Sequence, residues 1–138
     1  MILAIRISGL VKIDRDVEET LYRMRLRRKY VAVLLEDNAN NRKLLKRIRN
    51  FIAFGNINDN VLEKLIETRG KSIDGKKIDA KKIVQEINKK SLEKAGLKPF
   101  FRLHPPRKGI ESKKHFGVGK GVLGDNKDKI NDLVERML

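Results

Sequence analysis

The sequence of 138 residues contains no cysteine and no tryptophan, and it has only three prolines. The absence of cysteine excludes disulfide bonds and thiolate zinc sites, and it fits a reducing compartment. No apolar run approaches the roughly 18 residues that a membrane-spanning helix needs. The first residues carry neither a basic leader nor a small-residue cleavage site. We therefore expect no signal peptide, no membrane attachment and a cytoplasmic location.

Groups that commonly carry catalysis or bind metal are equally scarce. The two histidines, His104 and His115, have no carboxylate or second ligand at a recognised spacing. No serine or threonine lies in a nucleophile signature. Residues 119–124 match G-x-G-x-x-G, but a dinucleotide site also needs a strand just before the glycines and an acid about 20 positions later. We therefore expect no enzyme activity, no cofactor, no metal site and no small-molecule substrate.

Positive charge is what the sequence has in excess. Lysine and arginine number 33 and aspartate and glutamate 18, which gives a net charge of +15. A charge so far from zero attracts polyanions and carries no information about the fold. Nucleic acid is the first candidate partner, and an anionic membrane surface is the second. Hydrophobic residues make up 40% of the chain, which has about the length of one ordinary domain, so a buried core is expected.

Apolar periodicity predicts alternating strands and helices in the first part of the chain. Three segments rich in apolar and β-branched residues predict strands: 2–8, 30–35 and 51–57. Two apolar stripes at helical spacing predict the helices between them: Val17, Leu21 and Met24 in the first, and Leu44, Leu45 and Ile48 in the second. Residues 1–57 are therefore predicted to form a β-α-β-α-β core.

Residues 58–98 predict an inserted pair of helices. Asn60 with Glu63 resembles a capping box at the start of the first, and Gly70 is the predicted C-cap. About forty residues make a poor core alone. We therefore expect the insertion to belong to a single domain over residues 1–138.

All three prolines and five of the ten glycines lie in residues 99–124. Proline removes backbone donors and glycine resists ordering, so this tract is not a helix. Its apolar residues are costly to leave in water, which argues against disorder. We predict a short strand over residues 100–104 and then a long basic loop that a partner orders. Asp125 or Asn126 is expected to cap a last helix.

Two basic segments are the candidate contacts with nucleic acid. Lysine and arginine neutralise phosphates and release counterions, and glycine lets backbone N–H groups approach them. This mode fits folded RNA, which is recognised by shape and backbone. The first segment ends the first helix: Arg23, Arg25, Arg27, Arg28 and Lys29. A solvated helix end explains one or two of these charges but not five. The second segment is the basic loop: Arg102, His104, Arg107, Lys108, Lys113, Lys114, His115, Phe116 and Lys120. Phe116 is predicted either to stack on a base or to pack in the core.

These segments resemble a known family. FRLHPPRKG…KKHFGVGKGVLG resembles the F-R-L-x-P-P-R-G-G…GG-x-x-G segment of the universal large-subunit ribosomal protein thirty family, in its long archaeal and eukaryotic branch (protein seven in eukaryotic naming). The stretches IRISGLVKIDRDVEETLYRMRLRRKYVAVLLED, FIAFGNIN and NKDKINDLVERML look like other parts of that family, so the likeness covers nearly the whole chain. The chain departs from the family at Lys108, where a second glycine is usual, and at Lys120 in the glycine cluster.

The resemblance implies an α+β fold whose βαβαβ core is related to the ferredoxin-like fold. It implies a small three-stranded sheet in order 3-1-2, a helical insertion at 58–98, and a C-terminal part at 99–138 with the basic loop and a helix. It also implies a structural, non-catalytic constituent of the large ribosomal subunit that supports translation and subunit assembly. The implied partners are ribosomal RNA, near the 5S RNA region, and neighbouring ribosomal proteins. The alternative is a free-standing RNA- or nucleic-acid-binding protein that acts outside the ribosome.

Overall fold

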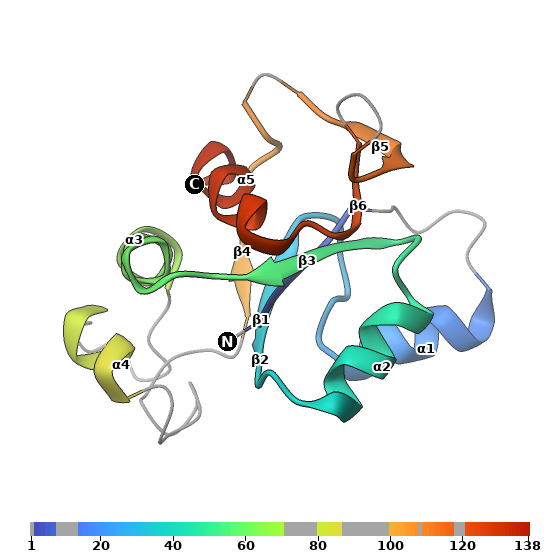
Figure 1. Cartoon of the computed structure of the whole chain (residues 1–138), viewed down its shortest axis with the longest axis horizontal. Coiled ribbons are helices and arrows are strands. Elements are labelled where there is room, and N and C mark those ends of the chain that lie inside the picture. The colour runs from blue at the N-terminus through green and yellow to red at the C-terminus, as the bar shows by residue number, and fades with distance from the viewer. Residues whose placement is uncertain (1, 8–13, 71–79, 87–99, 108, 118–120) are drawn as a thin grey trace.

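The computed structural model describes residues 2–7, 14–70, 80–86, 100–107, 109–117 and 121–138 (Figure 1). The strands are β1 (Ile2–Arg6), β2 (Val31–Leu35), β3 (Ile52–Asn56), β4 (Phe101–Arg102), β5 (Glu111–His115) and β6 (Gly121–Asp125). The helices are α1 (Arg15–Arg23), α2 (Ala39–Arg47), α3 (Asp59–Arg69), α4 (Ala80–Glu86), the 3-10 turn η1 (Lys127–Lys129) and α5 (Ile130–Met137). The predicted βαβαβ core is therefore confirmed.

The strands form a mixed sheet in the order β4-β2-β1-β3-β6-β5. β1 lies in the middle and runs antiparallel to both β2 and β3. The predicted order 3-1-2 is present at this centre, but the prediction of a small three-stranded sheet is wrong. β4 adds to β2, β6 adds in parallel to β3, and β5 pairs with β6. β4 falls within the strand predicted over residues 100–104. β5 and most of β6 lie in the tract predicted as a loop, because their backbone groups pair with strand edges that the local sequence does not reveal.

Side chains of β1 alternate between two cores, since successive strand residues point to opposite faces. Leu3, Ile5 and Ile7 enter one core and Ile2 and Ala4 the other. Helices α3 and α5 supply much of the first core: Val61, Leu62, Leu65, Ile66, Ile130, Leu133, Val134 and Met137. Residues of α1 and α2 and the turns that follow them supply the second: Leu21, Leu26, Leu45 and Ile48. The sheet is thus covered on both faces, with α1 and α2 together on one side (Figure 1).

Helix α3 begins before its predicted start. The side-chain Oδ1 of Asn58 accepts the N–H of Val61 at 2.9 Å, so Asn58 is the N-cap and the predicted capping box at Asn60 is wrong. Gly70 is the C-cap, as predicted. Asn131 of α5 joins this end to the sheet, because its Oδ1 accepts the N–H of Asn58 at 2.9 Å and its Nδ2 donates to the carbonyl of Asn56 at 3.2 Å.

Gly55 of β3 marks where the C-terminal elements pack onto the sheet. A Cβ atom there would lie 2.4 Å from the Lys127 carbonyl oxygen and 2.9 Å from Cβ of Ile130, so no larger residue fits without movement. The prediction that Asp125 or Asn126 caps the last helix is wrong, because the N-cap of α5 is Lys129 and Asn126, at the N-cap of η1, makes no side-chain capping bond. Asp125 Oδ1 accepts the N–H of Lys127 at 2.9 Å in the turn before the helix. The buried Asn126 side chain instead bonds backward to the β6 carbonyls.

The end of α5 bonds to the proline-rich residues 103–107 and to Gly109. The N–H groups of His104 and Arg107 donate to the carbonyls of Met137 and Arg136, at 2.9 and 3.0 Å. Nη1 of Arg136 donates in return to the carbonyls of Arg107 and Gly109. These bonds occupy carbonyls that a helix end leaves without partners. These bonds join the start of the tract to α5, and the expectation that a partner orders the loop stays a prediction.

Candidate nucleic-acid interface

The chain leaves α1 through a Schellman turn that carries an arginine where glycine is usual. The N–H of Leu26 donates to the Leu21 carbonyl at 2.9 Å, and that of Arg25 to the Tyr22 carbonyl at 3.1 Å. Arg25 has φ of 66°, in the left-handed region. Helix α1 ends at Arg23, so the other four cations of the predicted run lie in the turn before β2 and not on the helix. Matching to the helix dipole therefore does not account for them.

A buried arginine on β1 stabilises this turn by a hydrogen bond to its backbone. Arg6 on β1 is only 2% exposed, and its Nη1 donates to the Leu26 carbonyl at 2.8 Å. Burial lowers the pKa of the Arg6 guanidinium, because desolvation disfavours the charged form, while the charge of Glu18 opposes the shift. The Arg6 carbonyl also accepts the N–H of Tyr30 at 2.6 Å. Residues 26–30 are thus held against the sheet at both ends, with their charged side chains outward.

Two basic segments that are far apart in the sequence meet at one hollow of about 280 Å³. Pairing of β2 with β4 sets Val31 opposite Arg102, and the Leu103 N–H donates to the Tyr30 carbonyl at 3.0 Å. We call this site the arginine hollow, and six residues line it: Arg25, Arg27, Arg28, Val31, Phe100 and Arg102. The lining therefore contains four guanidinium groups, two apolar side chains and no carboxylate.

Aromatic rings contact two of these cations. The guanidinium carbon of Arg27 lies 4.1 Å from the centroid of the Tyr22 ring, and that of Arg102 lies 5.9 Å from the Phe100 ring. Such cation–π contacts favour a defined position for a long side chain. Tyr22 is nevertheless 58% exposed. Sequence reasoning assigned no role to Tyr22 or Phe100, and the only signal was an aromatic residue a few positions from an arginine.

The structure separates the other predicted site residues from the hollow. Arg23 forms an ion pair with Glu19 at 2.7 Å, and His104 and Arg107 are exposed beside the end of α5. β5, which contains Lys113, Lys114 and His115, stands at the opposite end of the strand order from β4. Phe116 is 41% exposed, so the alternative of core packing is wrong for it. Lys108 and Lys120 lie outside the described residues.

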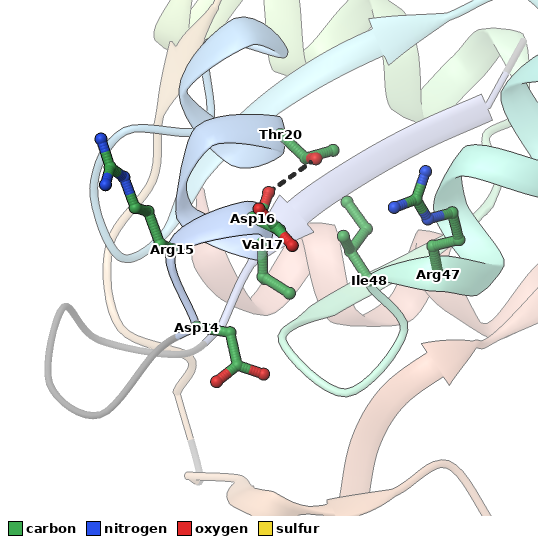
Figure 2. A pocket seen from close by; sticks show the side chains of 7 residues that line it. All are labelled: Asp14, Arg15, Asp16, Val17, Thr20, Arg47 and Ile48. Atoms are coloured by element: carbon green, nitrogen blue, oxygen red, sulfur yellow. Dashed lines mark hydrogen bonds between the residues drawn. The ribbon is translucent and has the colours of Figure 1, made fainter.

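A second hollow, of about 480 Å³, lies between the start of α1 and the end of α2 (Figure 2). Seven residues line it: Asp14, Arg15, Asp16, Val17, Thr20, Arg47 and Ile48. Thr20 Oγ1 donates to the backbone carbonyl of Asp16 at 2.9 Å (Figure 2). The two aspartates on the lining repel phosphate, so this hollow is less suited to a polyanion than the arginine hollow is.

The described part of the chain offers neither a metal cluster nor a membrane-spanning helix. No three histidine or acidic side chains in those ranges come together in a way that could hold a metal ion. None of the helices described there has both the length and the apolar character that crossing a bilayer requires.

Comparison with known proteins identifies the family. No family model matches the chain. Three archaeal proteins called large ribosomal subunit protein uL30 are similar to it over nearly its whole length. The protein of Aeropyrum pernix is 36% identical, with 97% of this chain and 96% of the relative covered. The proteins of Methanobrevibacter smithii and Archaeoglobus fulgidus are 33% and 31% identical, with 100% and 99% of each chain covered.

The chain belongs to the uL30 family of large ribosomal subunit proteins. The resemblance seen in the Phe-Arg-Leu-His-Pro-Pro-Arg string is thereby confirmed. The family also confirms the expected function as a structural ribosomal component and not an enzyme. Its expected location in the ribosome follows from the same comparison.

Proposed function

We propose that this uL30-family chain binds ribosomal RNA in the large subunit chiefly through the arginine hollow and the turn before β2. The observation that carries the proposal is the meeting of Arg25, Arg27, Arg28 and Arg102 around one hollow without a carboxylate. Guanidinium groups bind phosphate through paired N–H donors, and each phosphate neutralised releases counterions. A site with this lining attracts the RNA backbone and has nothing that repels it.

The fold already positions these arginines, so their side chains lose little conformational entropy when RNA binds. The Schellman turn, the buried Arg6 and the stacking of Arg27 on Tyr22 fix the backbone and one of the long side chains before RNA arrives. Ordering a flexible side chain on binding costs about 0.5–1.5 kcal/mol. Side chains that the fold has already placed avoid part of that cost, so this turn is suited to a fixed RNA shape.

The remaining predicted contacts form the second part of the proposal. They are Arg23, Lys29, His104, Arg107, Lys108, Lys113, Lys114, His115, Phe116 and Lys120. β4 and β5 stand at opposite ends of the strand order. The cations on β5 would therefore contact a different segment of RNA from the arginine hollow beside β4. We include a position near the 5S RNA region and contacts with neighbouring ribosomal proteins, which rest on the family resemblance. Crosslinking from position 116 to 5S RNA in assembled subunits tests the first of these.

Charge-matched variants test the main proposal. The first variant changes Arg25, Arg28 and Arg102 to glutamine, and the control changes the exposed Lys43, Lys46 and Arg49 around α2 in the same way. Both variants have three fewer positive charges than the wild type. We expect the first to dissociate from large subunits at lower salt than the control does in sedimentation. Its binding to large-subunit RNA should also depend less steeply on salt, because each phosphate that is no longer neutralised lowers the log–log slope by about 0.7–0.9. Equal retention and equal slopes for the two variants would refute the proposal.

A further inference from the structure

We infer that the arginine hollow receives a single unpaired RNA base, turned out of its stack, and that phosphates bind only at its rim. This inference rests on the proposed function and names the ligand of the same site. Its first support is the mixed lining. Phosphate needs only the cations, but Val31 and Phe100 add an apolar surface between them. A base is the part of RNA that has an apolar face to cover such a surface, and unstacked bases are commonly held on aromatic side chains.

The size of the hollow points to one base. Pockets for drug-sized ligands have volumes of roughly 300–1,000 Å³. The arginine hollow, at about 280 Å³, lies just below that range, so it has room for a group as small as a base. Its floor includes Val31, which is only 6% exposed, while Arg102 at its edge is exposed. A small planar group joined to a backbone outside the hollow fits this lining.

The chemistry of the lining also favours one kind of base. Arginine side chains donate hydrogen bonds and accept none. They pair with a base edge that offers two neighbouring acceptors, as O6 and N7 of guanine do. Their planes also stack on bases. We therefore assign the hollow to an unpaired guanine, with its ring against Phe100 and its acceptor edge toward the arginines.

Two positions with similar surroundings allow a matched test. Phe100 and Phe51 are both half-buried and both pack against the core beneath α1 and α2, but only Phe100 lines the hollow. The variants are Phe100→Leu, Phe100→Tyr and Phe51→Leu. Each is titrated against in vitro transcribed large-subunit ribosomal RNA of the same organism over a range of salt concentrations. Circular dichroism checks that each variant is folded.

We expect Phe100→Leu to bind at least about fivefold more weakly, the lower limit of what stacking on an aromatic ring contributes. Its salt slope should match the wild type, because every cation that neutralises a phosphate is still in place. Phe100→Tyr keeps the ring and should restore the affinity, and Phe51→Leu should bind like the wild type. Dimethyl sulfate, which methylates N7 of guanine, should find one guanine whose N7 the wild type protects and Phe100→Leu exposes.

Three results would overturn the inference. The first is unchanged affinity in Phe100→Leu. The second is an equal loss in Phe51→Leu, which would make the effect one of folding. The third is a lower salt slope in Phe100→Leu, which would mean that the ring only positions Arg102 for phosphate. If the three-arginine variant binds weakly while Phe100→Leu binds normally, the base assignment alone fails. If the arginine variant also binds normally, the proposed function fails at this face.

Discussion

Replacing Arg25 with glycine should give a more stable protein than replacing it with alanine, and both substitutions should weaken RNA binding. Arg25 occupies the left-handed position of the Schellman turn, with φ of 66°. A residue with a Cβ atom loses about 1–2 kcal/mol in that conformation. Glycine avoids this cost, but its greater conformational entropy stabilises the unfolded chain by about 0.4–1 kcal/mol. The net gain for glycine over alanine is therefore about 1 kcal/mol, which corresponds to about 4 °C in melting temperature for a domain of this size.

Arg25→Ala is the control, because it removes the same side chain and its interactions but keeps the strained backbone. We expect Arg25→Gly to be about 1 kcal/mol more stable than Arg25→Ala in urea unfolding followed by circular dichroism. Both variants should bind RNA equally weakly, since both lack one guanidinium of the arginine hollow. The slope of log affinity against log salt concentration should fall by the same amount in both. Equal stability of the two variants would refute the backbone argument. Wild-type affinity in both would refute the role of Arg25 in binding.

Four further variants test the fold and its pH dependence. Arg6→Ala leaves a buried carbonyl without its donor and opens a cavity, so urea unfolding should show a loss of about 3 kcal/mol. Gly55→Ala forces a methyl group against backbone, and a loss of about 1–3 kcal/mol in the same assay is expected; no change would mean that the last helix shifts freely. Asn131→Ala removes bonds to two neighbouring elements and should lower the free energy of unfolding by about 1–2 kcal/mol, which a lower melting temperature would report. Arg42 lowers the pKa of the Asp37 carboxyl. The pair therefore stabilises the fold above the unfolded pKa of Asp37, and this contribution is lost as pH falls through the folded pKa. Asp37→Asn should flatten that acid-side loss in stability measured against pH.

Local patterns were enough to predict the centre of the fold. Apolar and β-branched residues predicted a strand over residues 2–8, and β1 forms there, because such side chains suit a strand whose two faces are both buried. Local patterns gave the wrong N-cap for α3, which is Asn58 and not Asn60. Asn58 is also bonded through its N–H to Asn131, a residue distant in the sequence that no local pattern connects to it.

The candidate site divides in the same way. The sequence by itself determined the excess of positive charge, the two basic segments and the family, since composition and motifs do not depend on folding. Only the tertiary structure decided that Arg102 joins Arg25 and Arg28 while β5 lies at the far edge. The physical reason is that strand pairing sets which distant segments become neighbours. β4 has only two residues, and its place beside β2 depends on backbone hydrogen bonds that no side-chain pattern records.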